Sequence, residues 1–238
     1  MAASEPVRAR VLCFPHAGAG ASAYAGWSRW VEPGIELSGI QLPGREIRIR
    51  EPLISQLPIL VAALTDALAP ELDRPYVLFG HSMGALIAFE LARELRRRDL
   101  AQPSALFASA CRAPHLPSVE PDVHDLPEGE FLAALERLDG TPSDLVAEPE
   151  FRALLIPVLR NDMRLCETHV HEAGRPLDCP ITALGGHSDS RVSQGELAAW
   201  RQHTLAAFRL QLFHGSHFYI RDHGADIVRA LCGSVAGG

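Results

Sequence analysis

Short apolar segments alternate along this chain with longer segments whose apolar residues recur at helical spacing. The apolar segments lie at residues 10–14, 35–42, 75–79, 104–110, 181–184 and 208–213. Buried strands of a parallel sheet have this pattern, because apolar side chains cover both of their faces. Strands that alternate with helices predict an α/β fold with a mostly parallel, doubly wound sheet.

Three helical segments are marked by their ends as well as by their spacing. Ser55 is placed to cap a helix that runs to about Ala69. A second helix begins at Met83 and ends in the arginines of 96–98, which suit the negative end of a helix dipole. Residues 225–231 predict a closing helix.

Residues from about 112 to 176 interrupt this alternation, because they contain prolines, acids and helical patterns without a convincing strand. An insertion of this size between two strands predicts a helical lid over the sheet. A pair of ordinary packing helices has the same amphipathic pattern and stays open as an alternative. We expect a single domain over 1–238 that contains this insertion.

Composition sets limits on location and partners. The chain has 238 residues, 47% of them hydrophobic, and no run of apolar residues long enough to span a bilayer. The N-terminus lacks a signal-peptide pattern, and the five cysteines include no C-x-x-C pair. We therefore expect a cytoplasmic protein that neither binds membranes nor contains disulfides or a zinc ribbon.

Charge narrows the chemistry further. The net charge of -7 argues against nucleic acid as a partner. All 22 basic residues counted are arginines, so the chain has no lysine for a Schiff-base or serine-lysine mechanism.

Residues 80–84 read Gly-His-Ser-Met-Gly, a G-x-S-x-G pattern with an apolar strand before it and a long helix after it. This context is typical of a nucleophile elbow, a sharp turn that presents the serine hydroxyl in a cleft. Side chains at Gly80 or Gly84 would collide with the adjoining strand and helix. We therefore predict an α/β-hydrolase fold, with Ser82 as the catalytic nucleophile of a serine hydrolase.

A serine hydroxyl needs a histidine as general base, and the histidine needs a carboxylate that orients it. In hydrolases with this elbow, the chain order is serine, acid, histidine, and the base follows the last strand. This position selects His217, with His214 at the strand end as its rival. His81, the neighbour of Ser82, is expected to be structural.

Asp189 is the predicted acid, because it follows the strand at 181–184 in a turn that resembles the G-x-x-D turn of many α/β-hydrolases. Asp178 lies before this strand, at the wrong edge of the sheet. Asp162 and Asp222 fall in helical segments, and we expect them to be solvated or to cap helices.

Two backbone N–H groups are needed to hold the oxyanion that forms on a substrate carbonyl. One comes from the residue after the nucleophile and one from the loop after the first strand, which here are Met83 and Ala17. Small residues around Ala17 allow a close approach of the backbone to a ligand. Neither of the common glycine motifs for phosphate binding is present.

His169 and His171 lie close together in sequence, with Glu167 and Glu172 beside them. No H-E-x-x-H pattern occurs, and two residues that are two positions apart on a helix do not share a face. We therefore expect no metal site, and a surface or lid role for these side chains.

Residues 14–18, 41–46 and 80–84 form three motifs, and further ones lie at 112–114, 140–142, 157–162, 166–168, 200 and 215–218. Together they resemble the type II thioesterases that accompany polyketide synthases and nonribosomal peptide synthetases. The family's catalytic serine, aspartate and histidine fall on Ser82, Asp189 and His217. Two positions depart from the family: Ser216 replaces a usual glycine, and His169 stands where tyrosine is common.

The resemblance implies hydrolysis of an acyl thioester on the phosphopantetheine arm of an acyl or peptidyl carrier protein, which would remove aberrant or stalled groups. Phosphopantetheine belongs to the substrate, so we expect no cofactor on the enzyme, which we expect to be a monomer. A carboxylesterase, a lipase or an acyltransferase would use the same triad, and a non-catalytic docking partner would keep only the scaffold.

Carrier proteins are generally acidic, so an acidic enzyme would meet one through local arginines or apolar contacts. Arg45, Arg48 and Arg50 are one candidate cluster, and the arginines of 93–98 are another. Each cluster can equally consist of ordinary solvated charges.

Overall fold

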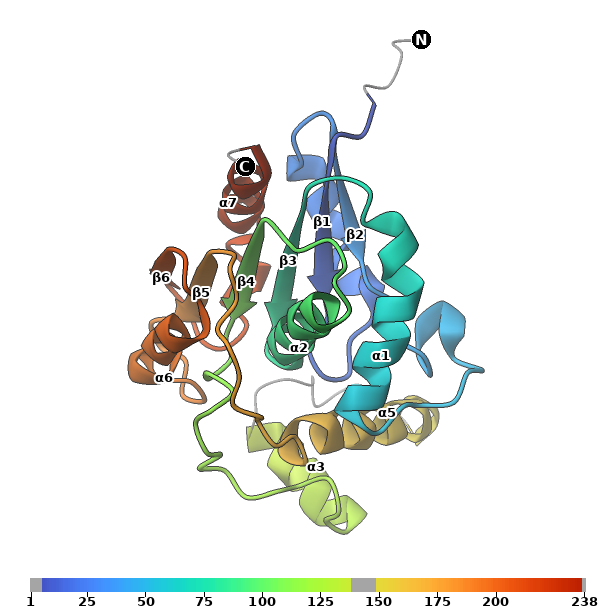
Figure 1. Ribbon diagram of the computed structural model, residues 1–238. Helices are drawn as coiled ribbons and strands as arrows, with labels where there is room; N and C mark the ends of the chain where they lie inside the picture. Colours follow the sequence, from blue (N-terminus) through green and yellow to red (C-terminus); the bar gives the residue numbers. More distant parts are fainter. Residues whose placement is uncertain (1–5, 138–148, 237–238) are drawn as a thin grey trace.

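In the computed structural model of the protein, residues 6–137 and 149–236 are described, and they contain a six-stranded sheet (Figure 1). Its order is β2-β1-β3-β4-β5-β6, and every neighbouring pair is parallel. The strands are β1 (Ala9–Phe14), β2 (Ile35–Gly39), β3 (Tyr76–His81), β4 (Ala105–Ser109), β5 (Ile181–Gly186) and β6 (Phe208–Phe213). The predicted α/β class is confirmed, and the motif at 140–142 lies outside the described residues.

The side chains of β1 alternate between two cores, one on each face of the sheet. Leu12 and Phe14 belong to the first core, and Val11 and Cys13 belong to the second. All four side chains are buried. A strand buried on both faces appears in sequence as a continuous apolar run, which is why such runs predicted the strands here.

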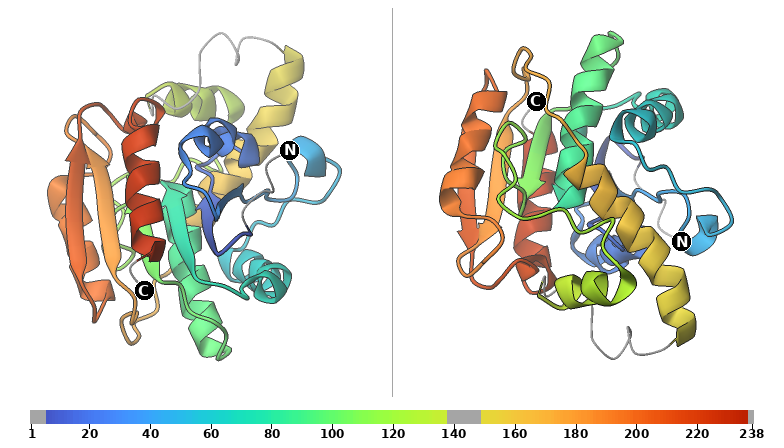
Figure 2. Two further views of the ribbon diagram at one scale, coloured as in Figure 1. Left: turned by 90° about the horizontal axis from the view of Figure 1, so that it is seen from above. Right: turned by 90° about the horizontal axis from the view of Figure 1, so that it is seen from below.

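Helices cover both faces of the sheet (Figure 2). The first core lies under α1 (Leu57–Leu68) and α2 (Met83–Arg97), and the second lies under η1 (Ala21–Trp30) and α7 (Gly224–Ala236). Shorter helices are η2 (Glu46–Arg48), η3 (Ala69–Glu71), α6 (Gln194–Ala198), η4 (Ala199–His203) and η5 (Tyr219–Arg221). Within the described ranges, no helix is both long and apolar enough to cross a membrane.

The start of α1 differs from the sequence prediction. Gln56, not Ser55, occupies the N-cap position, and its side chain makes no capping hydrogen bond. Pro58 stands in the first turn, where its missing N–H costs no helical hydrogen bond. The proline, rather than a serine cap, therefore fixes where this helix begins.

Strands β1 and β3 are neighbours at the centre of the fold, and the chain order runs in opposite directions across the sheet from this pair. In doubly wound sheets, such a switch point leaves a crevice at the carboxyl ends of the two strands. The loop after β1 contains Ala17, and the turn after β3 contains Ser82. The topology therefore brings these two segments to one edge of the sheet.

The inserted segment at 112–176 contributes α3 (Glu128–Arg137) and α5 (Pro149–Glu167), and its described part contains no strand. Both helices lie across the carboxyl ends of the central strands (Figure 1). Phe131, Leu135 and Leu159 form a small core of their own, against which Ala17 packs. The insertion thus rests on the loop after β1.

Candidate active site

Ser82 occupies the sharp turn between β3 and α2, as predicted for an elbow. Its backbone has φ 54° and ψ -118°, a conformation that L residues rarely adopt. The Ser82 N–H donates to the Ser109 carbonyl oxygen of the adjacent strand at 2.8 Å. The side chain itself is half-buried, so the turn presents a hydroxyl that a substrate can reach.

The two glycines of the elbow are required by close backbone packing. A Cβ atom at Gly80 would lie 2.1 Å from the Gly84 carbonyl carbon, and one at Gly84 would lie 2.1 Å from the Phe14 carbonyl oxygen. Neither backbone group can move aside as a flexible side chain would. The second contact also brings the N-terminus of α2 directly against the loop after β1.

Asp189 and His217 come together from the loops after β5 and β6. The His217 Nδ1 atom lies 2.9 Å from Asp189 Oδ2, and because a carboxylate only accepts, Nδ1 carries the proton. Asp189 Oδ1 accepts the backbone N–H of Arg191 at 2.8 Å and that of Val192 at 3.3 Å. The carboxylate is thus held by three donors and fixes one tautomer of the histidine.

Burial controls the charges of this pair. It lowers the pKa of His217 below its ordinary value, against the opposing hydrogen bond to Asp189, and the Arg191 guanidinium lowers this pKa further. For Asp189, burial by itself raises the pKa, but the hydrogen bond and charge of His217 and the two backbone N–H groups bring it below its usual value. A neutral imidazole beside an ionised carboxylate is the state that a general base requires.

The Nε2 atom of His217 is buried and has no hydrogen-bond partner among the described residues. No hydrogen bond therefore joins it to the Ser82 hydroxyl in this conformation. The His217 ring nevertheless lies next to the elbow, since its centroid is 5.3 Å from that of His81, the residue before Ser82. Hydrogen bonds between catalytic groups are often long before substrate binds.

The rival histidine, His214, is placed differently. His214 is exposed, and its ring centroid lies 5.5 Å from that of His187. The hydrogen bond to Asp189 is made by His217 instead. The geometry therefore favours His217 as the candidate base.

Ala17 and Met83 bring two N–H groups to the same edge of the sheet. Among the residues that the structure describes, neither N–H donates a hydrogen bond to another backbone carbonyl or to a side chain. Gly18 follows with φ +77°, and a Cβ atom there would lie 2.6 Å from Leu159 Cδ2 of α5. The positive φ therefore favours glycine at this position, and the Leu159 side chain of α5 lies directly against it.

A buried ion pair beside this loop was missed by the sequence analysis. Arg45 Nη1 and Nη2 donate to Asp162 Oδ2 and Oδ1 at 2.7 and 2.8 Å, and the two side chains are 6% and 0% exposed. Asp162 Oδ2 also accepts the Gly18 N–H at 2.8 Å. The expectation that Asp162 is solvated or caps a helix was therefore wrong, because α5 lies across the loop after β1 and buries this face.

Arg45 is likewise neither a docking residue nor a solvated charge, since it is buried against Asp162 and donates to the Ala19 carbonyl oxygen at 3.1 Å. The sequence did indicate that both residues matter, because Arg45 and Asp162 lie in the motifs at 41–46 and 157–162 that resemble the type II thioesterases. Spacing alone could not bring together two residues that are so far apart in the chain. Asp222 is exposed, as expected.

A second serine-histidine pair lies beneath the elbow. His81 Nδ1 is 2.8 Å from Ser109 Oγ, which lies 2.5 Å from the Tyr219 hydroxyl. Both His81 and Ser109 are fully buried, and burial holds the pKa of His81 well below its usual value. Because no substrate carbonyl can reach a hydroxyl that has no exposed surface, this pair is better suited to supporting the turn than to attacking a substrate.

The histidines considered for a metal lie outside this site. The helical spacing considered for them does not apply, because α5 ends at Glu167 and residues 169–176 are not helical. Glu167 turns away from them and accepts hydrogen bonds from the backbone N–H groups of Val123 and His124, each at 3.0 Å. His169 and His171 face Glu90 of α2 instead.

Comparison with known proteins extends over nearly all of the described chain. Residues 9–234 match the model of a family described as "Thioesterase domain". The gramicidin S biosynthesis protein GrsT of Aneurinibacillus migulanus is 38% identical over 223 residues, which cover 94% of this chain and 87% of that protein.

Two solved structures are similar in fold and in sequence. ClbQ from the colibactin NRPS/PKS pathway has a TM-score of 0.91 at 33% identity, covering 96% of this chain and 97% of its own. BorB, a type II thioesterase from the borrelidin biosynthetic cluster, has a TM-score of 0.88 at 34% identity, covering 98% of this chain and 94% of its own. The range that matches the family model includes Ser82, Asp189 and His217.

Proposed function

Because the chain belongs to the thioesterase family, and within it to the type II editing thioesterases of nonribosomal peptide and polyketide pathways, we propose a carrier-bound acyl thioester as its substrate. The acyl group would be carried on the phosphopantetheine arm of an acyl or peptidyl carrier protein. The observation that supports a hydrolytic role most strongly is the Asp189–His217 hydrogen bond beside the Ser82 elbow. We propose, as expected from the sequence, that the enzyme is cytoplasmic and acts as a monomer.

In the first half of the proposed reaction, the Ser82 hydroxyl oxygen attacks the thioester carbonyl carbon while His217 Nε2 takes the hydroxyl proton. The unpaired Nε2 and the proton on Nδ1 leave His217 ready for this step. Asp189 stabilises the imidazolium, and the N–H groups of Ala17 and Met83 hold the oxyanion. When the carbon–sulfur bond breaks, the thiol leaves with the proton from His217.

In the second half, water attacks the acyl-serine ester. His217 takes a proton from the water, the oxyanion forms against the same two N–H groups, and the Ser82 oxygen leaves with that proton. The products are a carboxylic acid and the regenerated serine. No metal or cofactor takes part in either half.

The insertion at 112–176 would act as the lid over this reaction. Support comes from α5, which packs on Gly18 through Leu159 and holds the Gly18 N–H through Asp162. A lid in direct contact with the loop after β1, which carries the Ala17 N–H, can exclude water from the acyl-enzyme until the thiol has left.

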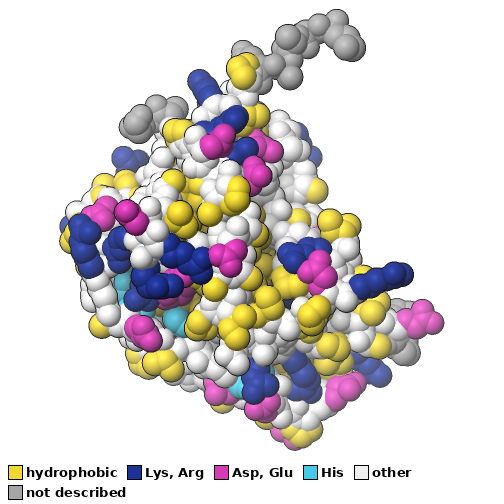
Figure 3. Space-filling model, turned by 45° about the vertical axis from the view of Figure 1, so that its right-hand side comes forward, with side chains coloured by type: hydrophobic (Ala, Val, Ile, Leu, Met, Phe, Trp, Pro, Cys, Tyr) yellow, Lys and Arg dark blue, Asp and Glu magenta, His cyan; other side chains and the backbone are white. Residues whose placement is uncertain are grey.

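The arginines of α2 are poor candidates for carrier docking, because most are tied to groups of the enzyme itself. Arg93 pairs with Glu90, Arg97 with Glu94, and Arg98 with both Glu94 and Asp66. Figure 3 shows basic side chains gathered on the left of this face, with acidic side chains at the edges of the group. Arg50, which is exposed beside the 91% exposed Ile47, fits an acidic partner with an apolar patch better.

Carrier proteins that bear a panel of acyl groups test the proposal, with deacylation followed by intact mass and Ser82→Ala as the control. We expect release of the free acid by the wild-type enzyme and none above background by the variant. Aryl oxygen esters of the same acyl groups are run in parallel. Much faster turnover of the oxygen esters, or transfer of the acyl group to an acceptor other than water, would overturn the proposal.

A further inference from the structure

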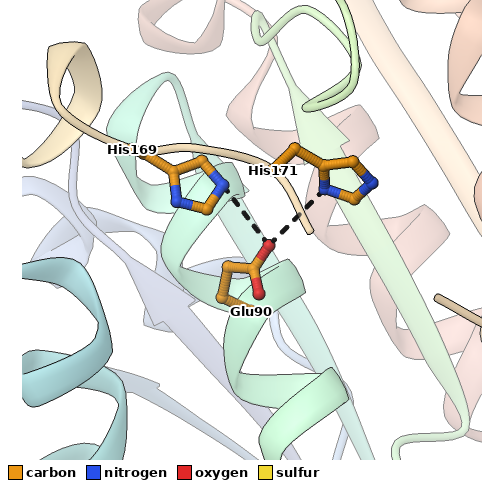
Figure 4. A group of neighbouring side chains, drawn as sticks. All are labelled: Glu90, His169 and His171. Atoms are coloured by element: carbon orange, nitrogen blue, oxygen red, sulfur yellow. Dashed lines mark ion pairs between the residues drawn. The ribbon is translucent and has the colours of Figure 1, made fainter. Parts of the chain in front are cut away.

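Glu90, His169 and His171 form a cluster on the outer side of α2, away from the elbow (Figure 4). Glu90 projects from α2, eight residues after Ser82, which corresponds to about 12 Å along the helix axis. His169 and His171 lie on the segment that leaves α5 and returns towards β5. Because this segment is not helical, the rule that residues two positions apart point to different sides of a helix does not apply to it.

The distances from Glu90 to the two histidines exceed those of direct hydrogen bonds, and the shorter one matches the spacing of two ligands around an ion. His169 Nε2 lies 3.5 Å and His171 Nδ1 4.0 Å from Glu90 Oε1, and all three atoms lie within 4.8 Å of one another. A direct N–H···O bond would be about 2.9 Å. Ligands held about 2.1 Å from a tetrahedral Zn²⁺ lie about 3.4 Å apart.

Both imidazole nitrogens that face Glu90 are buried, and neither has a hydrogen-bond partner within the described ranges. The three side chains are only 12 to 15% exposed. Buried polar atoms in folded proteins are almost always paired, because burial without a partner is costly. Two such nitrogens aimed at one carboxylate oxygen therefore point to a shared partner between them.

We propose that Glu90 Oε1, His169 Nε2 and His171 Nδ1 bind a divalent transition-metal ion of the Zn²⁺ class. Two imidazoles and one carboxylate are ligands that such ions prefer. A surface pocket of about 880 Å³, which Glu90 and His169 help to line, gives the ion a path from solvent.

Arg93 sets the strength of this site. Its Nη1 donates to both carboxylate oxygens of Glu90, at 2.9 and 3.0 Å, so a positive charge lies beside the ion. Oε1 keeps a second lone pair for a metal, but repulsion from the guanidinium lowers the affinity. The site is therefore weaker than one without this neighbour.

The ion would join α2, which begins directly after Ser82, to the segment that leaves the lid helix α5. It would be structural, since none of its ligands lies at the elbow. An ion that binds only the folded chain raises the stability in proportion to the logarithm of its concentration above Kd. The inference does not depend on the proposed thioesterase chemistry.

Calorimetric titration of the chelator-treated full chain with Zn²⁺ tests the proposal, with thermal unfolding as a second readout. We expect saturable binding of one ion per chain and a rise in Tm. The double variant His169→Ala, His171→Ala should bind at least about 100-fold more weakly and lose the rise in Tm. Glu90→Gln, which keeps the shape of the side chain, should also weaken binding.

The matched control is His187→Ala, His214→Ala, which removes two exposed imidazoles elsewhere and should bind Zn²⁺ like the wild-type chain. Arg93→Gln should bind Zn²⁺ more tightly than wild type, an effect that general damage to the fold would not produce. Circular dichroism of each variant establishes that it is folded. Absence of saturable binding by the wild-type chain, or equal binding by the His169/His171 variant, would overturn the proposal, whatever the hydrolytic activity.

Discussion

Arg45 and Asp162 form an ion pair with two hydrogen bonds, buried between the loop after β2 and helix α5. The same carboxylate oxygen that accepts Arg45 Nη1 accepts the N–H of Gly18, the residue after Ala17. The pair therefore links the lid helix directly to the loop that carries one proposed oxyanion donor.

Asp162→Asn should impair both stability and turnover. The substitution leaves Arg45 buried without an anion, and breaking a buried pair in this way costs about 3 to 5 kcal/mol. We also expect kcat to fall by about 10-fold or more, because a neutral amide replaces the charged carboxylate that Arg45 and the Gly18 N–H share, and holds the loop after β1 more weakly. Urea unfolding and steady-state kinetics measure the two effects.

The double variant Arg45→Met, Asp162→Leu separates these effects. Since it leaves no buried charge, it should recover much of the lost stability. Its kcat should stay low, because leucine offers the Gly18 N–H no acceptor. Wild-type kcat in either variant would show that the ion pair does not position the loop.

The pH dependence of kcat/KM should follow the protonation of His217. Burial lowers the pKa of His217, so the neutral base persists below the ordinary value of about 6.5. Activity should therefore rise with pH through an acid limb whose midpoint lies below 6.5, and should be lost as the pH falls through it. A midpoint above 7 would contradict this assignment.

Asp189→Asn provides the companion measurement. The hydrogen bond and charge of Asp189 raise the pKa of His217 against the effect of burial, so their removal should move the acid limb to still lower pH. We expect kcat to fall by about 10³- to 10⁴-fold, because the imidazole loses the partner that fixes its tautomer. An unmoved acid limb in this variant would mean that another group titrates.

Ser109→Ala distinguishes the two serine-histidine pairs. Ser109 bonds to His81 and Tyr219 and is fully buried, so its loss should cost about 1 to 3 kcal/mol of stability and leave most of the activity. Turnover of an acyl thioester by the folded variant is the measurement. Loss of activity in Ser109→Ala with activity retained in Ser82→Ala would move the nucleophile to Ser109.

His203 should make stability depend on pH. Burial lowers its pKa to about 4, and its Nε2 lies 2.7 Å from His115 Nδ1, a bond that needs at least one neutral ring. The unfolded chain takes up the proton near pH 6.5, so this stability is present above that pH and is lost as the pH falls towards 4.

Replacement of His203 should make the free energy of unfolding depend less on pH. Between pH 4 and 6.5, the free energy of unfolding of His203→Gln should change by about 1 to 2 kcal/mol less than that of the wild-type protein. This figure includes a reduction for screening by solvent. Denaturant unfolding at several pH values measures it. A profile as steep as that of the wild-type protein would assign the pH dependence to the other buried histidines.

Local sequence was enough to predict the elbow and most of the sheet. Ser82 is flanked by an apolar strand and an amphipathic helix, and the conformation it needs is set by its own glycines. The position of His217 after the last strand was predictable for the same reason, since parallel strands bring their carboxyl ends to one edge. Each of these features depends on neighbours in the chain.

Features that depend on packing between distant segments could not be predicted in this way. The burial of Asp162 depends on where α5 crosses the loop after β1, which no periodicity reveals. His169 and His171 were considered only with helical spacing, but α5 ends at Glu167, so their common approach to Glu90 was missed. An H-x-H segment outside a helix was the pattern to consider.

The central claim is that Ser82 is the nucleophile activated by His217. Its most direct test is labelling of the full chain with a fluorophosphonate, in which a serine oxygen bonds to phosphorus and fluoride leaves, followed by peptide mapping. We predict one adduct, on the peptide that contains Ser82, retained in Ser109→Ala, absent in Ser82→Ala and strongly slowed in His217→Ala. An adduct on another serine, or undiminished labelling of Ser82→Ala, would contradict the claim.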